Sequence, residues 1–586
     1  MERSPPFTTR PELRGTVGMV ASTHWLASAA GMAVLERGGN AFDAAVAAGF
    51  VLQVVEPHLN GPGGEAPIVL YSADRDEVLV VEGQGPAPAA ATIGRFRELG
   101  LDLVPGTGLL AACVPGAFDA WLLLLRELGT LSLAQVLEPA LGYAEGGYPV
   151  VPGICRSIAA VEELFRTEWP ESGRLYLPIP EPGSLFRNRD LAATYRRVLD
   201  EAGAGGRERQ IDAARDVFYR GFVAEAIAEY LAHGEAMDSS GRRHKGLLSG
   251  DDLASWQASL EPPVELDYHG WRVSKTGPWG QGPVFLQQLA LLDGYDLGSL
   301  DRASAEFVHT VVECAKLAFA DREAWYGDPD FVDVPLDELL GAHYAEERRA
   351  LVGESASAEL RPGSPNGREP RLPTVPDVDA LVPGLGDPTR GDTCHVDVVD
   401  RYGNAVSATP SGGWLHGSPV VPGLGFCLGT RAQMFWLDEG LPSSLEPRKR
   451  PRTTLSPTIA RRDDGTTIAF GTPGGDQQDQ WQVLMFLHHV HHGMNLQAAI
   501  DAPAFHIEHM PSSFWPRQAR PGVVVVEDRF APAARDALKA RGHTVEAGPG
   551  WSEGRLCACA QEETPDGKIL KAGANPRGMQ GYALGR

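Results

Sequence analysis

One stretch of the sequence places a candidate nucleophile where chain cleavage would activate it. Thr393 follows a Pro/Gly-rich segment, residues 362–392, and opens a run of alternating apolar residues to Val399. The alternation predicts a strand, a turn near Gly403, and a return strand over 405–409. Cleavage before Thr393 would give this residue both a hydroxyl nucleophile and a free amine as its base. The alternative is an ordinary hairpin, because threonine is a good strand residue.

A glycine-rich turn downstream supplies the second part of this chemistry. Gly471-Thr-Pro-Gly-Gly475 lies about 80 residues after Thr393, and two of its glycines can offer backbone N–H groups to an oxyanion. Glycine suits this role because the backbone must approach the tetrahedral oxygen closely. A Pro-Gly-Gly turn alone is weak evidence, so its position after the hairpin carries the prediction.

Short motifs occur in a fixed order from about Gly18 to the C-terminus. Around Thr393 lies Asp392-Thr-Cys-His-Val-Asp-Val-Val-Asp-Arg-Tyr-Gly-Asn-Ala-Val-Ser407. The other motifs are Ser28-Ala-Ala-Gly31, Gly38-Gly-Asn-Ala-Phe-Asp-Ala-Ala-Val46, Glu56-Pro-His58, Tyr326-Gly-Asp-Pro-Asp-Phe331, Arg450-Pro-Arg-Thr-Thr-Leu-Ser-Pro-Thr-Ile459 and Gly471-Thr-Pro-Gly-Gly475. Together they resemble the gamma-glutamyltransferases, which are N-terminal-nucleophile hydrolases. The resemblance is specific for the family and much less specific for the substrate.

The resemblance implies that the chain cleaves itself. Thr393 attacks the carbonyl of Asp392, and an N-to-O acyl shift followed by ester hydrolysis frees the Thr393 amine. The expected products are a large region, 1–392, ending in the loop 362–392, and a small catalytic region, 393–586. These fragments would remain together as a heterodimer. In turnover, the hydroxyl attacks an amide, and the acyl group passes to water or an amine acceptor; no cofactor and no metal are expected.

The family also implies an α/β fold, the four-layer αββα sandwich, with strands from both regions. Periodicity alone predicts only mixed helices and strands. Helices are expected over 24–37, 41–55, 304–325 and 480–492; residues 116–147 are expected to be helical, and residues 191–234 to contain further helices. The expected strands span 17–21, 67–71, 78–82, 271–276, 425–428, 455–461, 466–470, 523–527 and 556–561.

Several residues match positions of known role in the family's motifs, and the resemblance implies the same roles for them here. Ser411 aligns with the hydroxyl residue, usually threonine, that hydrogen-bonds the nucleophile; a turn serine after Pro410 is the alternative. Gly474 and Gly475 match the oxyanion glycines. Thr453 and Thr454 take the place of two serines that contact substrate.

The sequence departs from the family where the glutamyl group would bind. Gln84 replaces the arginine that clamps the substrate α-carboxylate as a bidentate pair. Met434 stands where the acid for the α-ammonium group is expected, and a one-residue slip would place Phe435 there instead. Gly413 replaces a substrate-contacting asparagine. Arg431 adds a positive charge near the same wall, although an arginine in a loop is usually solvated.

These observations leave several functions open. The first is γ-glutamyl transfer or hydrolysis, acting on glutathione-like small-molecule amides or peptides. The departures, and a short segment at 436–447 that predicts a more open cleft, favour the alternative of a non-glutamyl, acylase-like amide hydrolase. An unprocessed, non-catalytic scaffold is a further alternative. A cysteine hydrolase using Cys394 is disfavoured, because strand alternation turns Cys394 away from the Thr393 side.

Composition and charge limit the classes of partner and the cellular location that we expect for this chain. The 586 residues carry a net charge of −24, which disfavours nucleic acid and anionic membranes as partners. No apolar run approaches the ~20 residues needed to span a bilayer, and the N-terminus lacks a secretory apolar core, so we expect a cytoplasmic enzyme. Seven scattered cysteines predict reduced thiols. The run His488-His-Val-His-His492 would spread around a helix, which disfavours a metal site, and Gly61-Pro-Gly-Gly64 lacks the P-loop lysine.

Overall fold

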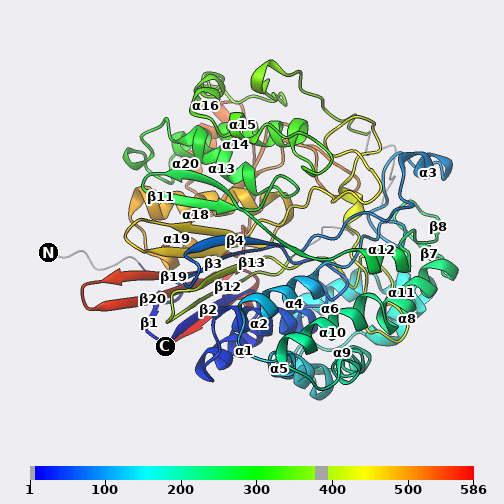
Figure 1. Cartoon of the computed structure of the whole chain (residues 1–586). Helices are drawn as coiled ribbons and strands as arrows, with labels where there is room; N and C mark the ends of the chain where they lie inside the picture. Colours follow the sequence, from blue (N-terminus) through cyan, green and yellow to red (C-terminus); the bar gives the residue numbers. More distant parts are fainter. Residues whose placement is uncertain (1–6, 377–392) are drawn as a thin grey trace.

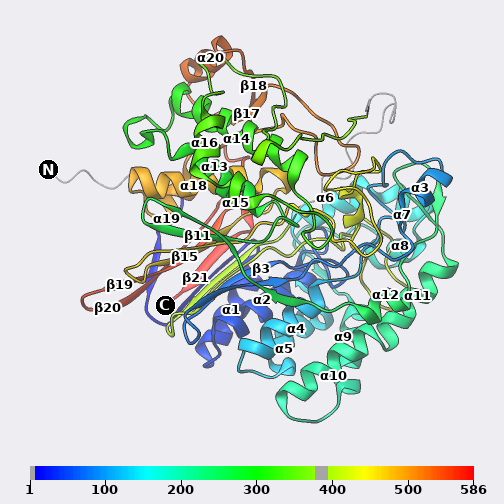
Figure 2. The ribbon, with the colours of Figure 1, turned by 45° about the horizontal axis from the view of Figure 1, so that its top comes forward.

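A computed structural model describes residues 7–376 and 393–586 as two stacked seven-stranded sheets flanked by helices (Figures 1 and 2). The first sheet has the order β21 (Tyr582–Gly585), β2 (Gly18–Ser22), β12 (Val396–Asp400), β13 (Ala405–Ala408), β3 (Ile68–Ser72), β4 (Glu77–Glu82) and β9 (Ser259–Glu261). The second has the order β1 (Leu13–Gly15), β20 (Gly567–Ala574), β19 (Cys557–Thr564), β15 (Thr467–Gly471), β14 (Thr458–Arg461), β11 (Trp271–Lys275) and β10 (Val264–Tyr268).

Three apolar cores separate the four layers. One lies under the helices of the first sheet, which include α1 (Trp25–Glu36), α2 (Ala41–Val55), α4 (Ala117–Leu128), α5 (Leu133–Gly146), α9 (Arg189–Ala202), α10 (Arg207–Tyr219) and α11 (Phe222–His233). A second lies between the sheets and contains Met19, Val69, Val399, Ile459 and Leu570. The third lies under α13 (Gly282–Leu292), α14 (Ala305–Trp325), α18 (Gln478–His492), α19 (Leu496–Asp501) and α20 (Pro532–Ala540). The predicted αββα sandwich is confirmed.

Strands from both sides of the proposed cleavage point interleave in each sheet. β12 pairs with β2 on one side and with β13 on the other, and β13 pairs with β3. In the second sheet, β11 pairs with β14 and β1 pairs with β20. The two parts of the chain therefore share both sheets. A smaller sheet, β16 (Phe505–Ile507), β17 (Val523–Glu527) and β18 (Thr544–Gly548), lies beside α20.

Several predicted boundaries are wrong. The stretch expected to be helical over 116–147 contains two helices, α4 and α5, because the chain turns at Gly129 between them. The strand expected over 425–428 forms only isolated bridges from Cys427 and Leu428. Packing decides this geometry: the carbonyl of Gly425 accepts a hydrogen bond from Asn188 Nδ2 at 2.7 Å. Within 362–392, residues 362–376 contain one 3-10 turn, Pro365–Gly367, whereas Asp392 lies outside the described residues.

Two composition-based observations can be compared with the structure. All seven cysteines are buried and unpaired, as predicted. Among the described residues, no helix has the length and apolar character that a bilayer crossing requires.

The histidines of α18 have separate partners. His491 Nε2 lies 2.7 Å from the Tyr268 hydroxyl, and His489 Nδ1 lies 2.8 Å from the Met494 carbonyl oxygen. His488 is buried against Phe307, and desolvation lowers its pKa to about 3. The side chains do not converge, as predicted.

His488→Gln should make the protein less sensitive to acid. An unfolded chain protonates His488 below its usual pKa of 6.5, whereas the folded chain keeps it neutral until about pH 3. The free energy of unfolding therefore decreases as the pH falls below 6.5, because the unfolded chain binds a proton at His488 and the folded chain does not. At pH 5 this loss amounts to about 2 kcal/mol. Thermal midpoints of wild type and variant should diverge between pH 7 and pH 5; parallel curves would contradict the assignment.

Candidate active site

The hairpin register places Thr393 opposite Ser411. Both lie just beyond the β12–β13 pair and form an isolated antiparallel bridge. Thr393 Oγ1 and Ser411 Oγ are 3.2 Å apart, within hydrogen-bonding distance. Both residues are buried. The structure thus brings together the two hydroxyl groups that the sequence singled out, although β12 itself begins three residues after Thr393, at Val396.

Cys394 faces away from this pair. Its Sγ lies 2.9 Å from Glu56 Oε2 and accepts from Asn60 Nδ2 at 3.1 Å. Burial, followed by the nearby Glu56 carboxyl, raises the pKa of the Cys394 thiol well above its usual range. A thiol in this state is a poor nucleophile.

Arg431 contacts the hydroxyl pair through Ser411. It begins a short 3-10 helix, η3 (Arg431–Met434), and is 2% exposed, so the alternative of a solvated arginine is wrong. Its Nε donates to Glu65 Oε1 at 2.6 Å, and its Nη2 donates to the same carboxylate and to Ser411 Oγ at 3.0 Å. The guanidinium carbon also lies 5.3 Å from the Trp414 ring centroid. Arg431 is therefore held by a carboxylate of the chain itself.

Glu65 is a site residue that the sequence analysis did not single out, although it directly follows a glycine-rich loop. The loop Gly61-Pro-Gly-Gly64 has no nucleotide-binding features, but it delivers Glu65 to the site. Backbone bonds of 2.9 Å in both directions join Glu65 to Ser411. A Cβ on Gly64 would lie 2.0 Å from the Ser411 carbonyl oxygen, so this close approach requires glycine.

The glycine-rich turn adopts backbone geometry that favours glycine. Gly474 has φ of 129° and Gly475 has φ of 58°. A Cβ on Gly474 would lie 2.2 Å from the Trp481 ring, and one on Gly475 would lie 2.8 Å from Phe514. At the start of the turn, a Cβ on Gly471 would lie 2.2 Å from the His395 ring. The turn therefore runs beside the strand that follows Thr393.

Buried polar residues hold this turn in place. Gln281 Nε2 donates to the Gly475 carbonyl oxygen at 3.2 Å. Asp476 accepts from Arg322 Nη1 at 2.5 Å and from the Ser513 backbone N–H at 2.8 Å. Sequence reasoning missed these residues; the one local signal was the acidic residue directly after the glycine pair. Since Arg322 lies on α14 and Gln281 precedes α13, helices of the large region support the turn.

The two threonines at 453 and 454 differ in their bonding. The Thr453 carbonyl accepts from the Gln281 backbone N–H at 2.9 Å, which ties it to the same support as the glycine turn. Its hydroxyl accepts from the Leu455 backbone N–H at 3.4 Å. Thr454 Oγ1 is buried and has no hydrogen-bond partner among the described residues.

At the position of the family's clamping arginine, the Gln84 side chain has a neutral carbonyl oxygen and no positive charge. Its Nε2 donates to the neighbouring Gly85 carbonyl at 3.0 Å, whereas its buried Oε1 has no partner in the described ranges. Because a carbonyl can only accept, the amide orientation is fixed. Among the described residues, no hydrogen bond joins Gln84 to Thr393 or Arg431. Gly413, the other departure, has φ of 67° and packs against the Cys427 carbonyl, which explains the glycine.

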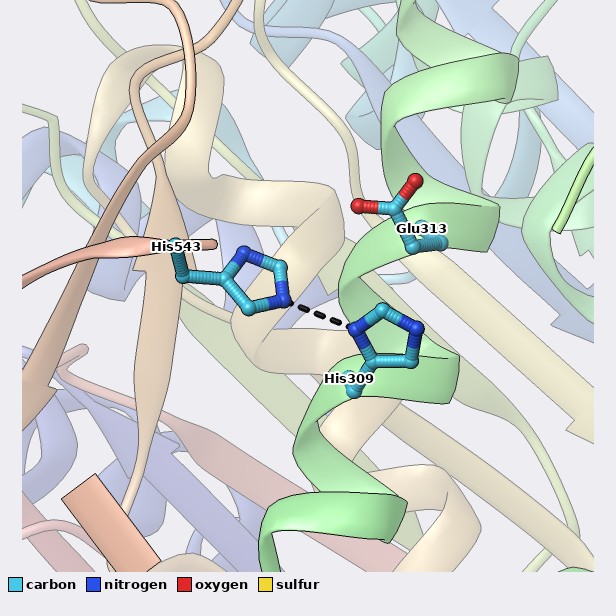
Figure 3. Close-up of side chains that lie close together, drawn as sticks. All are labelled: His309, Glu313 and His543. Atoms are coloured by element: carbon cyan, nitrogen blue, oxygen red, sulfur yellow. Dashed lines mark hydrogen bonds between the residues drawn. The ribbon is translucent and has the colours of Figure 1, made fainter. Parts of the chain in front are cut away.

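One group of potential metal ligands lies elsewhere, on α14 and before β18 (Figure 3). His309 Nε2 faces the Gly353 carbonyl at 2.9 Å, so it carries the proton, and His309 Nδ1 accepts from His543 Nε2 at 2.8 Å. Glu313 already accepts from two cations, Lys316 Nζ at 2.7 Å and Arg361 Nη2 at 3.3 Å. The ligand atoms of His309 and Glu313 are therefore used in internal hydrogen bonds, whereas His543 Nδ1 is buried without a partner among the described residues. A single remaining ligand atom disfavours a metal site here.

Comparisons with known proteins agree with this geometry. The family model for gamma-glutamyltranspeptidase matches residues 27–585. The chain is 32% identical over 576 residues to the glutathione hydrolase-like YwrD proenzyme of Bacillus subtilis, which covers 97% of this chain and 99% of that protein. It is also 32% identical over 574 residues to the acylase ACY 1 proenzyme of Pseudomonas sp. (strain SE83), covering 95% and 92%.

A solved structure extends the likeness to the whole fold. The structure of LmbA2991HD is 58% identical and superposes with a TM-score of 0.94, covering 99% of this chain and 100% of that chain. The similar proteins therefore include both glutathione hydrolase-like and acylase proenzymes. The chain belongs to the gamma-glutamyltranspeptidase family and is an amide-cleaving enzyme with the N-terminal-nucleophile hydrolase fold.

Proposed function

We propose that this chain is a self-processing threonine amidase whose acyl substrate is not γ-glutamyl. The observation that carries the proposal is the buried Glu65–Arg431 pair beside Ser411 and Thr393. The one arginine that the sequence offered as a replacement clamp already has a carboxylate partner. The acylase ACY 1 proenzyme, a relative of this chain, shows that the family includes enzymes named as acylases.

The proposed reaction begins after cleavage between Asp392 and Thr393, which leaves regions 1–392 and 393–586 paired. The Thr393 amine takes the hydroxyl proton while Oγ1 forms a bond to the amide carbon. Backbone N–H groups of Gly474 and Gly475 stabilise the oxyanion. The amide C–N bond then breaks, and the leaving amine takes the proton. Water, or an amine acceptor, attacks the resulting ester and regenerates Thr393.

A γ-glutamyl group fits the proposed pocket poorly. Its α-carboxylate would meet the Gln84 oxygen, which has no partner in the described part of the chain, where the family has an arginine, and Arg431 is occupied by Glu65. Its α-ammonium group would meet the uncharged Met434. Leaving a buried charge without its partner costs about 3–5 kcal/mol. The pocket instead suits an uncharged acyl group.

Gln84→Arg combined with Met434→Asp should raise activity on γ-glutamyl 4-nitroanilide more than either change alone. The two new charges act on one zwitterionic substrate, so their effects should not be additive. Wild type should cleave this anilide roughly 10²–10³-fold less efficiently than a phenylacetyl anilide, measured as kcat/KM, from the missing partners. The phenylacetyl anilide serves as the internal control in every variant.

Efficient cleavage of γ-glutamyl 4-nitroanilide by wild type, lost in Arg431→Ala through a rise in KM that the phenylacetyl anilide does not show, would reverse this conclusion. It would mean that Arg431 leaves Glu65 to bind the substrate carboxylate, and γ-glutamyl hydrolysis would become the preferred function. The glutathione hydrolase-like relative makes this the second candidate.

A further inference from the structure

A continuous hydrogen-bonded chain connects Glu65 to the proposed nucleophile. Arg431 Nε donates to Glu65 Oε1 at 2.6 Å, Arg431 Nη2 donates to Ser411 Oγ at 3.0 Å, and Ser411 Oγ lies 3.2 Å from Thr393 Oγ1. All four residues are at most 3% exposed. Sequence comparison with the family motifs assigns a role only to Ser411 and Thr393.

We infer that Arg431, held in place by Glu65, is a positioning residue that orients the Ser411 hydroxyl towards Thr393 Oγ1. This inference rests on the proposed function, in which Thr393 is the nucleophile. A guanidinium can only donate, so it occupies a lone pair of Ser411 Oγ. With a lone pair of Ser411 Oγ used in this way, the Ser411 hydroxyl can donate its proton to Thr393 Oγ1, 3.2 Å away. Thr393 Oγ1 then accepts this bond, and its own proton is free to leave as the oxygen attacks.

Glu65 fixes the direction of the guanidinium. Its backbone pairs with Ser411 in both directions, so carboxylate and hydroxyl move as one unit. A Cβ on Gly412 would lie 2.5 Å from Glu65 Oε2. Because glycine has no Cβ, the backbone next to Ser411 can lie close to the carboxylate. Removing the carboxylate would leave a buried cation without its partner, so Arg431 would be free to turn away from Ser411.

The competing role for Arg431 is that of a substrate clamp. A clamp binds the substrate directly, so its removal should raise KM for a carboxylate-bearing substrate. A positioning residue should lower kcat with little change in KM, whatever the acyl group. The two roles also differ in whether the effect of removing Arg431 depends on the presence of the Ser411 hydroxyl.

A double-mutant cycle between Arg431→Met and Ser411→Ala tests the inference. The first readout is the self-cleavage rate of newly synthesised chain, because it needs no added substrate. The second is kcat and KM for phenylacetyl 4-nitroanilide with the cleaved fraction. Each single variant should slow both reactions on the order of tenfold or more. The double variant should be no more than about threefold slower than Ser411→Ala, because residues that act as a unit are not additive.

Conservative variants refine the test. Arg431→Lys keeps a cationic donor and should recover part of the lost rate, and Glu65→Gln should slow the reaction without raising KM. If Arg431→Met fails to fold, Arg431→Lys takes its place in the cycle. Arg577→Lys is the matched control, because Arg577 is a buried arginine that donates to Glu527 at 2.9 Å, outside the site. It should leave both rates unchanged.

Two results would overturn the inference: additive losses in the double variant, or a KM increase that accounts for the whole effect of Arg431→Met. Failure of the proposed function would look different. In that case Thr393→Ala would retain amidase activity, and the cycle would have no bearing on catalysis. Loss of activity in Thr393→Ala together with additive effects in the cycle would remove only the role of Arg431.

Discussion

Thr393→Ala should remain a single polypeptide and should have no detectable amidase activity. Wild-type protein should separate under denaturing conditions into fragments 1–392 and 393–586. Under native conditions the fragments should co-elute, because strands from both sides of Thr393 pair with each other in each sheet, as in the β2–β12 and β1–β20 pairs. Denaturing electrophoresis and native size-exclusion chromatography measure both expectations.

Thr393→Ser is the matched control, since it keeps the hydroxyl and removes only a methyl group. It should still cleave itself, whereas Thr393→Ala should fold to the same native size without cleaving. An intact wild-type chain that hydrolyses amides would rule out the N-terminal-nucleophile mechanism.

Gly475→Val should lower turnover on the order of a hundredfold or more by disturbing the oxyanion donors. The native φ of 58° disfavours a branched side chain, and a Cβ would already lie 2.8 Å from the Phe514 ring. The backbone N–H should therefore be displaced from the position that the oxyanion requires. Turnover is measured on cleaved enzyme, because self-cleavage and turnover need not respond equally.

Gly493→Ala provides the control for backbone strain in this prediction. Gly493 also has positive φ, 61°, but a Cβ there would meet no atom within 4 Å, and it lies at the end of α18. It should cost some stability and leave turnover unchanged. Near-normal turnover in cleaved Gly475→Val would remove Gly475 from the mechanism.

Local pattern was sufficient for much of the fold. The predicted helix 41–55 is α2 with the same bounds, because all of its residues are buried and its start carries an Asn40–Asp43 capping box. The β12–β13 hairpin was predicted from alternation and a glycine turn, and this register brings Thr393 to Ser411. The strand expected over 425–428 is reduced to isolated bridges, and the Gly425 carbonyl at its start bonds instead to Asn188, a partner that no local pattern reveals.

The site shows the same limit. Thr393 and Gly475 lie in recognisable motifs, whereas Glu65 and Arg431 are 366 positions apart, and their pairing emerges only from the fold. Buried ion pairs of this kind depend on where two distant loops meet. The sequence therefore predicted that Arg431 was new to the site, but not that it was already neutralised.

The most direct test of the account is the mass of the small fragment during turnover. Cleaved enzyme is quenched in acid while hydrolysing phenylacetyl 4-nitroanilide, and fragment 393–586 is analysed by mass spectrometry. The account predicts an increase equal to one acyl group, located by peptide sequencing on Thr393. A quenched fragment acylated on another residue, such as Cys394, would contradict the assignment of Thr393 as the nucleophile.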